Sequence, residues 1–191
     1  MSHPEQVAAH IQDTLNLYSD ISKNNLPAVS IVKPSGYVDG HPSSSKLNLF
    51  EGFVKKIVDQ VEASAYANDT AIFITFDEGG GYYDSGYVQP LDYFGDGTRI
   101  PLIVVSPHVI PGHISHDYAD HVSIIKFIER NWDLQPITYR SRDNYPNPIA
   151  LPNNPYVPVN HPAISDLFDM FDFGQGNGNN QGGNGQHGWD H

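Results

Sequence analysis

The chain has 191 residues, a length typical of one domain, and a formal net charge of −12, with 10 Lys and Arg against 22 Asp and Glu. This charge would repel a nucleic acid or an anionic membrane surface on average, so we expect no nucleic acid as a partner. The sequence has no cysteine, which excludes disulfides and thiolate metal sites, and no apolar run of the roughly 20 residues that a membrane-spanning helix needs. The first residues do not have the layout of a secretory signal, and the sequence does not indicate a cellular location.

The first part of the chain predicts a helix, a strand and a second helix. Residues 2–5 have the form of a capping box, and an amphipathic pattern follows them to about Leu17. Residues 26–32 are predicted to form a strand, and the Pro-, Gly- and Ser-rich stretch 34–45 a loop at its carboxyl end. Apolar residues at helical spacing then predict a helix over 49–61 that covers one face of a sheet.

A very apolar strand at 70–76 comes next and ends in two adjacent carboxylates, Asp77 and Glu78. Its β-branched and aromatic residues show no polar alternation, which is typical of a strand covered on both faces of a parallel sheet. With the strand at 26–32 and the helix between them, it should form a right-handed βαβ unit. Parallel sheets bind ligands at the carboxyl ends of their strands, where the two carboxylates lie.

Asp77 and Glu78 are therefore candidate ligands of a divalent cation. Successive strand residues point to opposite faces, so two neighbours can share one cation only where the backbone turns, and the glycines at 79–81 permit such a turn. Carboxylate oxygens are the hard donors that Ca²⁺ and Mg²⁺ prefer. The alternative is that the segment DEGGG is only a turn with two solvated acids.

The rest of the chain predicts one more strand, one more helix and two irregular regions. We interpret the Gly- and Tyr-rich loop at 79–97 as a flap on the substrate side. A third buried strand is predicted at 101–105, and a helix at about 121–131. After Thr138 the chain is rich in proline, and we expect it to wrap the surface.

Residues 174–191 are almost all Gly, Asn or Gln and should be disordered, because they cannot bury enough apolar area to offset the entropy of ordering. The predicted organisation is one domain over 1–173 and a tail over 174–191.

Three sequence blocks between residues 20 and 138 point to a known family. The first is LPAVSIVKP at 26–34, followed by GHP at 40–42. The second is FDEGGGYYD at 76–84, and the third comprises RIPLIVVSP at 99–107 and DHVSIIKFIE at 120–129. In this order they resemble blocks of the phosphoesterase family that contains bacterial phospholipases C and acid phosphatases, a branch of the alkaline phosphatase superfamily.

The resemblance implies a metal-dependent hydrolase of phosphate esters that acts through a covalent phosphoenzyme. It implies an α/β fold, a three-layer sandwich with a mostly parallel sheet. Asp77 and Glu78 would hold the divalent cation, of unknown identity, and His41 matches a histidine that faces the phosphoryl group, although a turn histidine before proline is the alternative. Asp120 and His121 match the "DH" block. For Asp120 the alternative is a helix N-cap, and for His121 the functional interpretation is a place at the edge of the site.

Two parts of the family's catalytic domain have no counterpart in the sequence: a Glu-Asn pair near its start and a Ser or Thr nucleophile after that pair. We therefore interpret the chain as the later part of the domain, with a phosphate ester as substrate and the amino-terminal part of the same domain as partner. The alternative is a non-catalytic truncated remnant, or a module that binds a cation or an anion. Ser85 stands where a histidine often follows "YD", which leaves the choice between phospholipid and phosphomonoester open.

Overall fold

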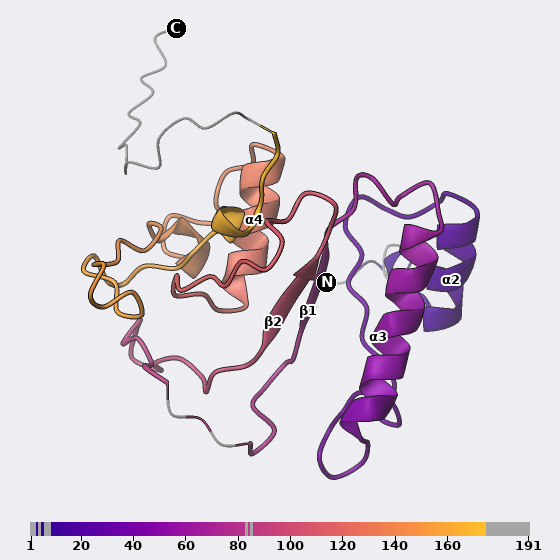
Figure 1. Cartoon of the computed structure of the whole chain (residues 1–191), viewed down its shortest axis with the longest axis horizontal. Coiled ribbons are helices and arrows are strands. Elements are labelled where there is room, and N and C mark those ends of the chain that lie inside the picture. The colour runs from indigo at the N-terminus through magenta and orange to yellow at the C-terminus, as the bar shows by residue number, and fades with distance from the viewer. Residues whose placement is uncertain (1–2, 4, 6–8, 83, 85, 175–191) are drawn as a thin grey trace, which may run out of the picture.

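The computed structural model describes residues 3, 5, 9–82, 84 and 86–174, so the predicted tail beyond Gly174 and half of the predicted capping box lie outside the described residues. Figure 1 shows a small β-sheet between α4 (Val122–Asn131) on one side and α2 (Thr14–Ser22) and α3 (Leu47–Glu62) on the other. No helix in these ranges is long and apolar enough to cross a membrane. The elements are, in chain order, α2 (Thr14–Ser22), α3 (Leu47–Glu62), β1 (Ile72–Thr75), β2 (Leu102–Val105), α4 (Val122–Asn131) and the 3₁₀-helices η1 (Arg142–Asn144) and η2 (Phe168–Met170).

Strands β1 and β2 form a two-stranded antiparallel sheet in which Ile72 lies opposite Val105 and Thr75 opposite Leu102. Both strands are confirmed within their predicted ranges. A mostly parallel sheet is not seen in the described part of the chain. The loop from 76 to 101 contains no described helix that could carry the chain back across the sheet, so β2 runs opposite to β1. The described part of the chain thus contains both helices and strands and is of the α/β class, with β1 and β2 consecutive between α3 and α4.

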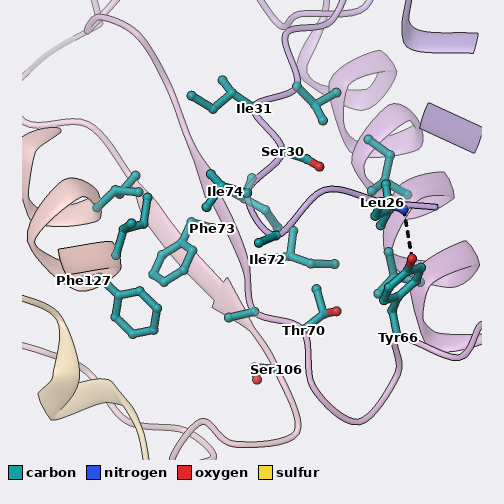
Figure 2. A pocket seen from close by; sticks show the side chains of 18 of the residues that line it. Leu26, Ser30, Ile31, Tyr66, Thr70, Ile72, Phe73, Ile74, Ser106 and Phe127 are labelled. Atoms are coloured by element: carbon teal, nitrogen blue, oxygen red, sulfur yellow. Dashed lines mark hydrogen bonds between the residues drawn. The ribbon is translucent and has the colours of Figure 1, made fainter. Parts of the chain in front are cut away.

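The predicted strand at 26–32 is wrong, and with it the predicted βαβ unit. The segment is irregular and has a bend at Ala28 and Val29. Leu26 donates its backbone N–H to the hydroxyl of Tyr66 (2.9 Å), but the backbone of 27–32 makes no hydrogen bond to any described residue. A sequence of high β-propensity becomes a strand only beside another strand edge. Here a cleft separates the segment from the nearest edge, that of β1 (Figure 2).

The helix predicted to about Leu17 is interrupted, because residues 11–13 are irregular between helical residues 9 and 10 and the start of α2, whereas α3 and α4 begin and end close to their predicted bounds. The carboxylate of Asp13 accepts a hydrogen bond from Leu15 N–H (2.8 Å), which caps the first turn and fixes the start of α2 at Thr14. α2 packs beside α3 (Figure 1). α4 has a strongly amphipathic sequence, and its apolar side faces the sheet through Phe127.

The hydrophobic core lies between β1 and α4 and is closed by the carboxyl-terminal part of the described chain. Phe127, Leu167 and Phe171 are buried together, and the rings of Phe73 and Phe127 lie 4.9 Å apart. Ile164 is fully buried. The prediction that the Pro-rich region only wraps the surface is thus wrong for 163–171, because its few apolar residues complete the core.

Lys126 of α4 anchors this Pro-rich region to the core. Its ammonium donates hydrogen bonds to the carbonyl oxygens of Tyr145 and Ile164 and to the side-chain oxygen of Asn147 (2.7, 2.5 and 3.2 Å). Burial lowers the pKa of Lys126, and the three oxygen acceptors compensate for lost hydration. Proline has no backbone N–H, so this region can form few regular backbone hydrogen bonds. The hydrogen bonds of one lysine side chain hold it in place instead.

Candidate functional site

A cleft of about 480 Å³ lies at the carboxyl end of β1 and contains four of the five residues that the sequence predicts for the site. Asp77, Glu78, Asp120 and His121 all line it, and His41 does not. The turn after β1 contributes the first two residues and the segment directly before α4 the other two, so two segments more than 40 positions apart meet there. The remaining lining residues are Gly79, Tyr87, Asp96, Gly97, Thr98, Arg99, Ile100, Ser115, His116, Asp117, Tyr118, Ala119 and Tyr156.

Lys33 lies beside Asp77, a contact that sequence reasoning missed. Its Nζ is 3.4 Å from Asp77 Oδ2, and the hydrogen bond and charge of the ammonium lower the pKa of Asp77. The side chains are 74% and 80% exposed, so the pair contributes little to stability and is easily opened. The signal for Lys33 was present in the sequence, because the residue is the next-to-last of the block LPAVSIVKP.

His121 and Asp120 join the beginning of α4 to the end of β1. His121 Nε2 donates a hydrogen bond to the carbonyl oxygen of Phe76 (2.8 Å), the residue directly before Asp77. The carboxylate of Asp120 accepts from the N–H (2.7 Å) of Val122, the first residue of α4, although the N-cap position itself is occupied by His121. His121 thus lines the cleft and holds the backbone directly before the two carboxylates.

Arg142 holds the flap against the same helix end. Its guanidinium lies between three carboxylates, at 2.8 Å from Asp92, 3.6 Å from Asp96 and 3.5 Å from Asp120, and it donates to the carbonyl oxygen of Gly95 (2.7 Å). Burial raises the pKa of Asp120, and the nearby Arg142 opposes that rise. Sequence reasoning missed Arg142, since it lies in the Pro-rich region far from every block.

The glycines after Glu78 let two other segments approach the site. Gly80 and Gly81 have φ of +59° and +79°, a conformation that other residues rarely adopt. A Cβ at Gly79 would overlap the hydroxyl oxygen of Thr98, and one at Gly80 would lie 3.4 Å from Pro42. The turn therefore brings a hydroxyl group, that of Thr98, next to the two carboxylates, and it brings the loop of His41 to the rim.

His41 is exposed and lies in its own turn, outside the residues that line the cleft. Its Nδ1 accepts a hydrogen bond from Ser43 N–H (3.2 Å) and contacts the Ser43 hydroxyl (2.9 Å). Because a backbone N–H can only donate, the proton of the neutral ring is on Nε2. His41 therefore offers a hydrogen-bond donor toward solvent, and its role at a phosphoryl group stays a prediction.

The donor chemistry at the cleft suits a hard divalent cation, but the number of donors is small. No group of three or more His, Cys, Asp or Glu side chains poised to hold a metal occurs among the residues that the structure describes. Ca²⁺ and Mg²⁺ take six or more oxygen ligands, of which Asp77 and Glu78 could supply two to four. The remaining ligands would have to be water, substrate or other polypeptide.

Asp84, in the second sequence block, ties the flap to the irregular segment that leads into β2. Its carboxylate accepts from the backbone N–H groups of Arg99 (2.6 Å) and Gly86 (2.8 Å) and from Arg99 Nε (2.9 Å). These hydrogen bonds, led by that of the Arg99 backbone, lower the pKa of Asp84 to about 2. The carboxylate is therefore ionised at neutral pH and serves the structure of the flap.

We expect Asp84→Asn to lower the melting temperature at neutral pH and to flatten its acid dependence. The folded pKa of about 2 lies below the unfolded value of about 3.9, so the stabilisation is present above about pH 4 and disappears as the pH falls toward 2. Melting curves of both proteins between pH 6 and pH 3 measure this difference, which should shrink with acidification. A constant gap across that range would contradict the assignment.

Comparison with known proteins gives a family match over most of the chain. A sequence model described as "Phosphoesterase family" matches residues 2–135, which include all five predicted site residues. Among curated relatives, non-specific phospholipase C6 of Arabidopsis thaliana is 27% identical over 164 residues, which cover 69% of this chain and 31% of that protein. Hemolytic phospholipase C of Pseudomonas aeruginosa is 30% identical over 142 residues, 62% of this chain and 19% of the relative.

Phospholipase C B of Mycobacterium tuberculosis is 25% identical over 185 residues, which cover 80% of this chain and 36% of that protein. The chain thus spans between about a fifth and about a third of the length of these relatives.

Proposed function

This chain belongs to the phosphoesterase family, and from that premise we propose that it supplies the cation-binding part of an active site that hydrolyses phosphate esters. The observation that carries the proposal is the cleft at the end of β1, which gathers four sequence-predicted residues from two distant segments. Family membership does not by itself require that these side chains meet. Their meeting at the carboxyl end of a half-buried strand is the arrangement expected of a catalytic site in an α/β protein.

Asp77 and Glu78 are the residues that would hold the divalent cation. When bound, the cation would neutralise phosphate charge and lower the pKa of a hydroxyl nucleophile. The chain's own donors complement this role: the Lys33 ammonium lies beside Asp77, and His41 carries its proton on Nε2. Each could donate to an oxygen of the phosphoryl group, which develops charge during transfer.

We further propose that the nucleophile and the remaining ligands come from an amino-terminal part of the same catalytic domain. Its hydroxyl oxygen would attack phosphorus, the ester's alcohol would leave with a proton, and water would then cleave the phosphoenzyme. Together the parts would form a three-layer α/β sandwich with a mostly parallel sheet. The relatives support this proposal by their length, since each has more than 60% of its chain outside the matched region.

One observation favours a non-catalytic alternative. Lys33 already pairs with Asp77, and an ammonium in that place could substitute for a bound cation. The chain would then be a truncated remnant that binds an anion, or a cation weakly.

The test is to read the coding sequence upstream of Met1, and then to express the longer protein that it encodes. We expect an in-frame Glu-Asn pair and a Ser or Thr nucleophile. We also expect the longer protein to hydrolyse p-nitrophenyl phosphorylcholine faster than p-nitrophenyl phosphate, because the similar proteins carry the name phospholipase C. A stop codon directly upstream, or no turnover of either ester, would favour the remnant.

A further inference from the structure

The molecule contains a second and larger cleft, of about 820 Å³, beside the outer edge of β1 (Figure 2). β2 pairs with one edge of β1, and no described residue pairs with the other. The cleft begins at this free edge, where Ile72 and Ile74 lie, and reaches the irregular segment 26–34 on its opposite side. It is separate from the cleft that contains Asp77, and the two share only His121 among their lining residues.

Helices wall this cleft on two sides. α3 contributes Phe53, Val54 and Ile57, and α4 contributes Ile124 and Ile128. Figure 1 shows α3 and α4 on opposite sides of the sheet, so the space between them continues the layer in which β1 and β2 lie. A space of this kind, apolar on both faces, is what a buried strand of a sandwich occupies.

The backbone on both borders of the cleft has unused hydrogen-bonding groups. An unpaired strand edge is a template for another strand, and β1 presents one. Across the cleft, the backbone of 27–32 has no partner among the described residues, and Ile31 is 96% exposed. An apolar small molecule would fill the volume but would leave these N–H and C=O groups unpaired, whereas a strand could satisfy them.

We propose that this cleft is the docking site of a β-strand of apolar sequence, supplied by polypeptide outside the 191 residues. The inference rests on the proposal that another part of the domain accompanies this chain, but not on its catalytic activity. The length of the relatives shows that similar proteins contain ample further polypeptide. The strand would pair with β1, place its side chains against α3 and α4, and give 27–32 a neighbour with which to become a strand itself.

The experiment uses the 191-residue chain and a synthetic peptide with five central valine and isoleucine residues and two lysines at each end. A second peptide carries the same side chains with all five central amides N-methylated, so it keeps the apolar surface but cannot donate hydrogen bonds. Amide hydrogen exchange, followed by NMR, reports on β1. We expect the first peptide to slow exchange of the outer-edge amides of β1 at least about tenfold, and the methylated peptide to have no such effect.

Two variants of the chain test whether the peptide binds in this cleft. Ile31→Ser removes an exposed side chain at the cleft, so it should spare the fold and weaken peptide binding. Ile137→Ser is the matched control, because Ile137 is 68% exposed and lines neither cleft, and it should bind the peptide as the unmodified chain does.

Three results would overturn the proposal. Equal binding of both peptides would mean a site for any apolar ligand, and protection that rises with protein concentration in the absence of peptide would identify a second copy as the occupant. Unchanged exchange of β1 with saturating peptide would mean that the edge accepts no strand. None of these outcomes depends on turnover, so the proposed activity is tested separately.

Discussion

Replacing Asp77 or Glu78 by alanine is expected to lower kcat/KM of the longer protein by about two to three orders of magnitude, the usual effect of losing a preorganised charge-stabilising group. Each variant should also lose its response to added divalent cation. The physical reason is that both carboxylates lie at one strand end, where the turn at 79–81 lets them face the same ion. The measurements are phosphate-ester turnover over a range of cation concentrations and cation affinity by calorimetry.

The matched control is Glu51→Ala, which removes one exposed carboxylate from α3, away from the cleft, at a position where alanine suits the helix. It should leave both activity and cation affinity unchanged. Equal losses in all three variants would indicate a general effect of negative charge and no defined site at Asp77 and Glu78.

The purified 191-residue chain is expected to show no steady turnover of a chromogenic phosphate ester, even with excess divalent cation. Two carboxylates, an ammonium and an imidazole provide binding and charge, but the covalent route needs a hydroxyl nucleophile in addition. Thr98 is the hydroxyl that approaches the glycine turn most closely. If turnover does occur, Asp77→Asn would show whether it belongs to this cleft, and Thr98→Val would show whether this threonine is the nucleophile.

The regular elements with strong local patterns could be predicted from the sequence. β1 and α4 have continuous apolar or helical periodicity, and both lie where the pattern indicates. The strand at 26–32 has the same composition as a real strand, but a strand also requires a partner edge, which single-segment patterns do not reveal. The antiparallel direction of β2 was missed for a related reason. The direction of a strand depends on the loop or helix that connects it to the preceding strand, and the sequence of the strand itself does not reveal it.

The candidate site was predictable to the extent that it lies in contiguous blocks. Asp77 with Glu78 and Asp120 with His121 are adjacent pairs at element ends, and the structure places both pairs in one cleft. Arg142 could not be predicted, since it acts through contacts with acids at least 22 positions away in sequence, and nothing in its local pattern sets it apart.

The region of similarity and the folding unit do not coincide in this chain. The family match ends at residue 135, yet Ile164, Leu167 and Phe171 close the core on α4, and the oxygen acceptors of Lys126 all lie beyond residue 144. A polypeptide cut at the end of the match would keep the five site residues predicted from the sequence, but it would expose the apolar side of α4 and leave the Lys126 ammonium without acceptors. The segment that contains the five predicted site residues therefore depends, for its fold, on a segment that contains none of them.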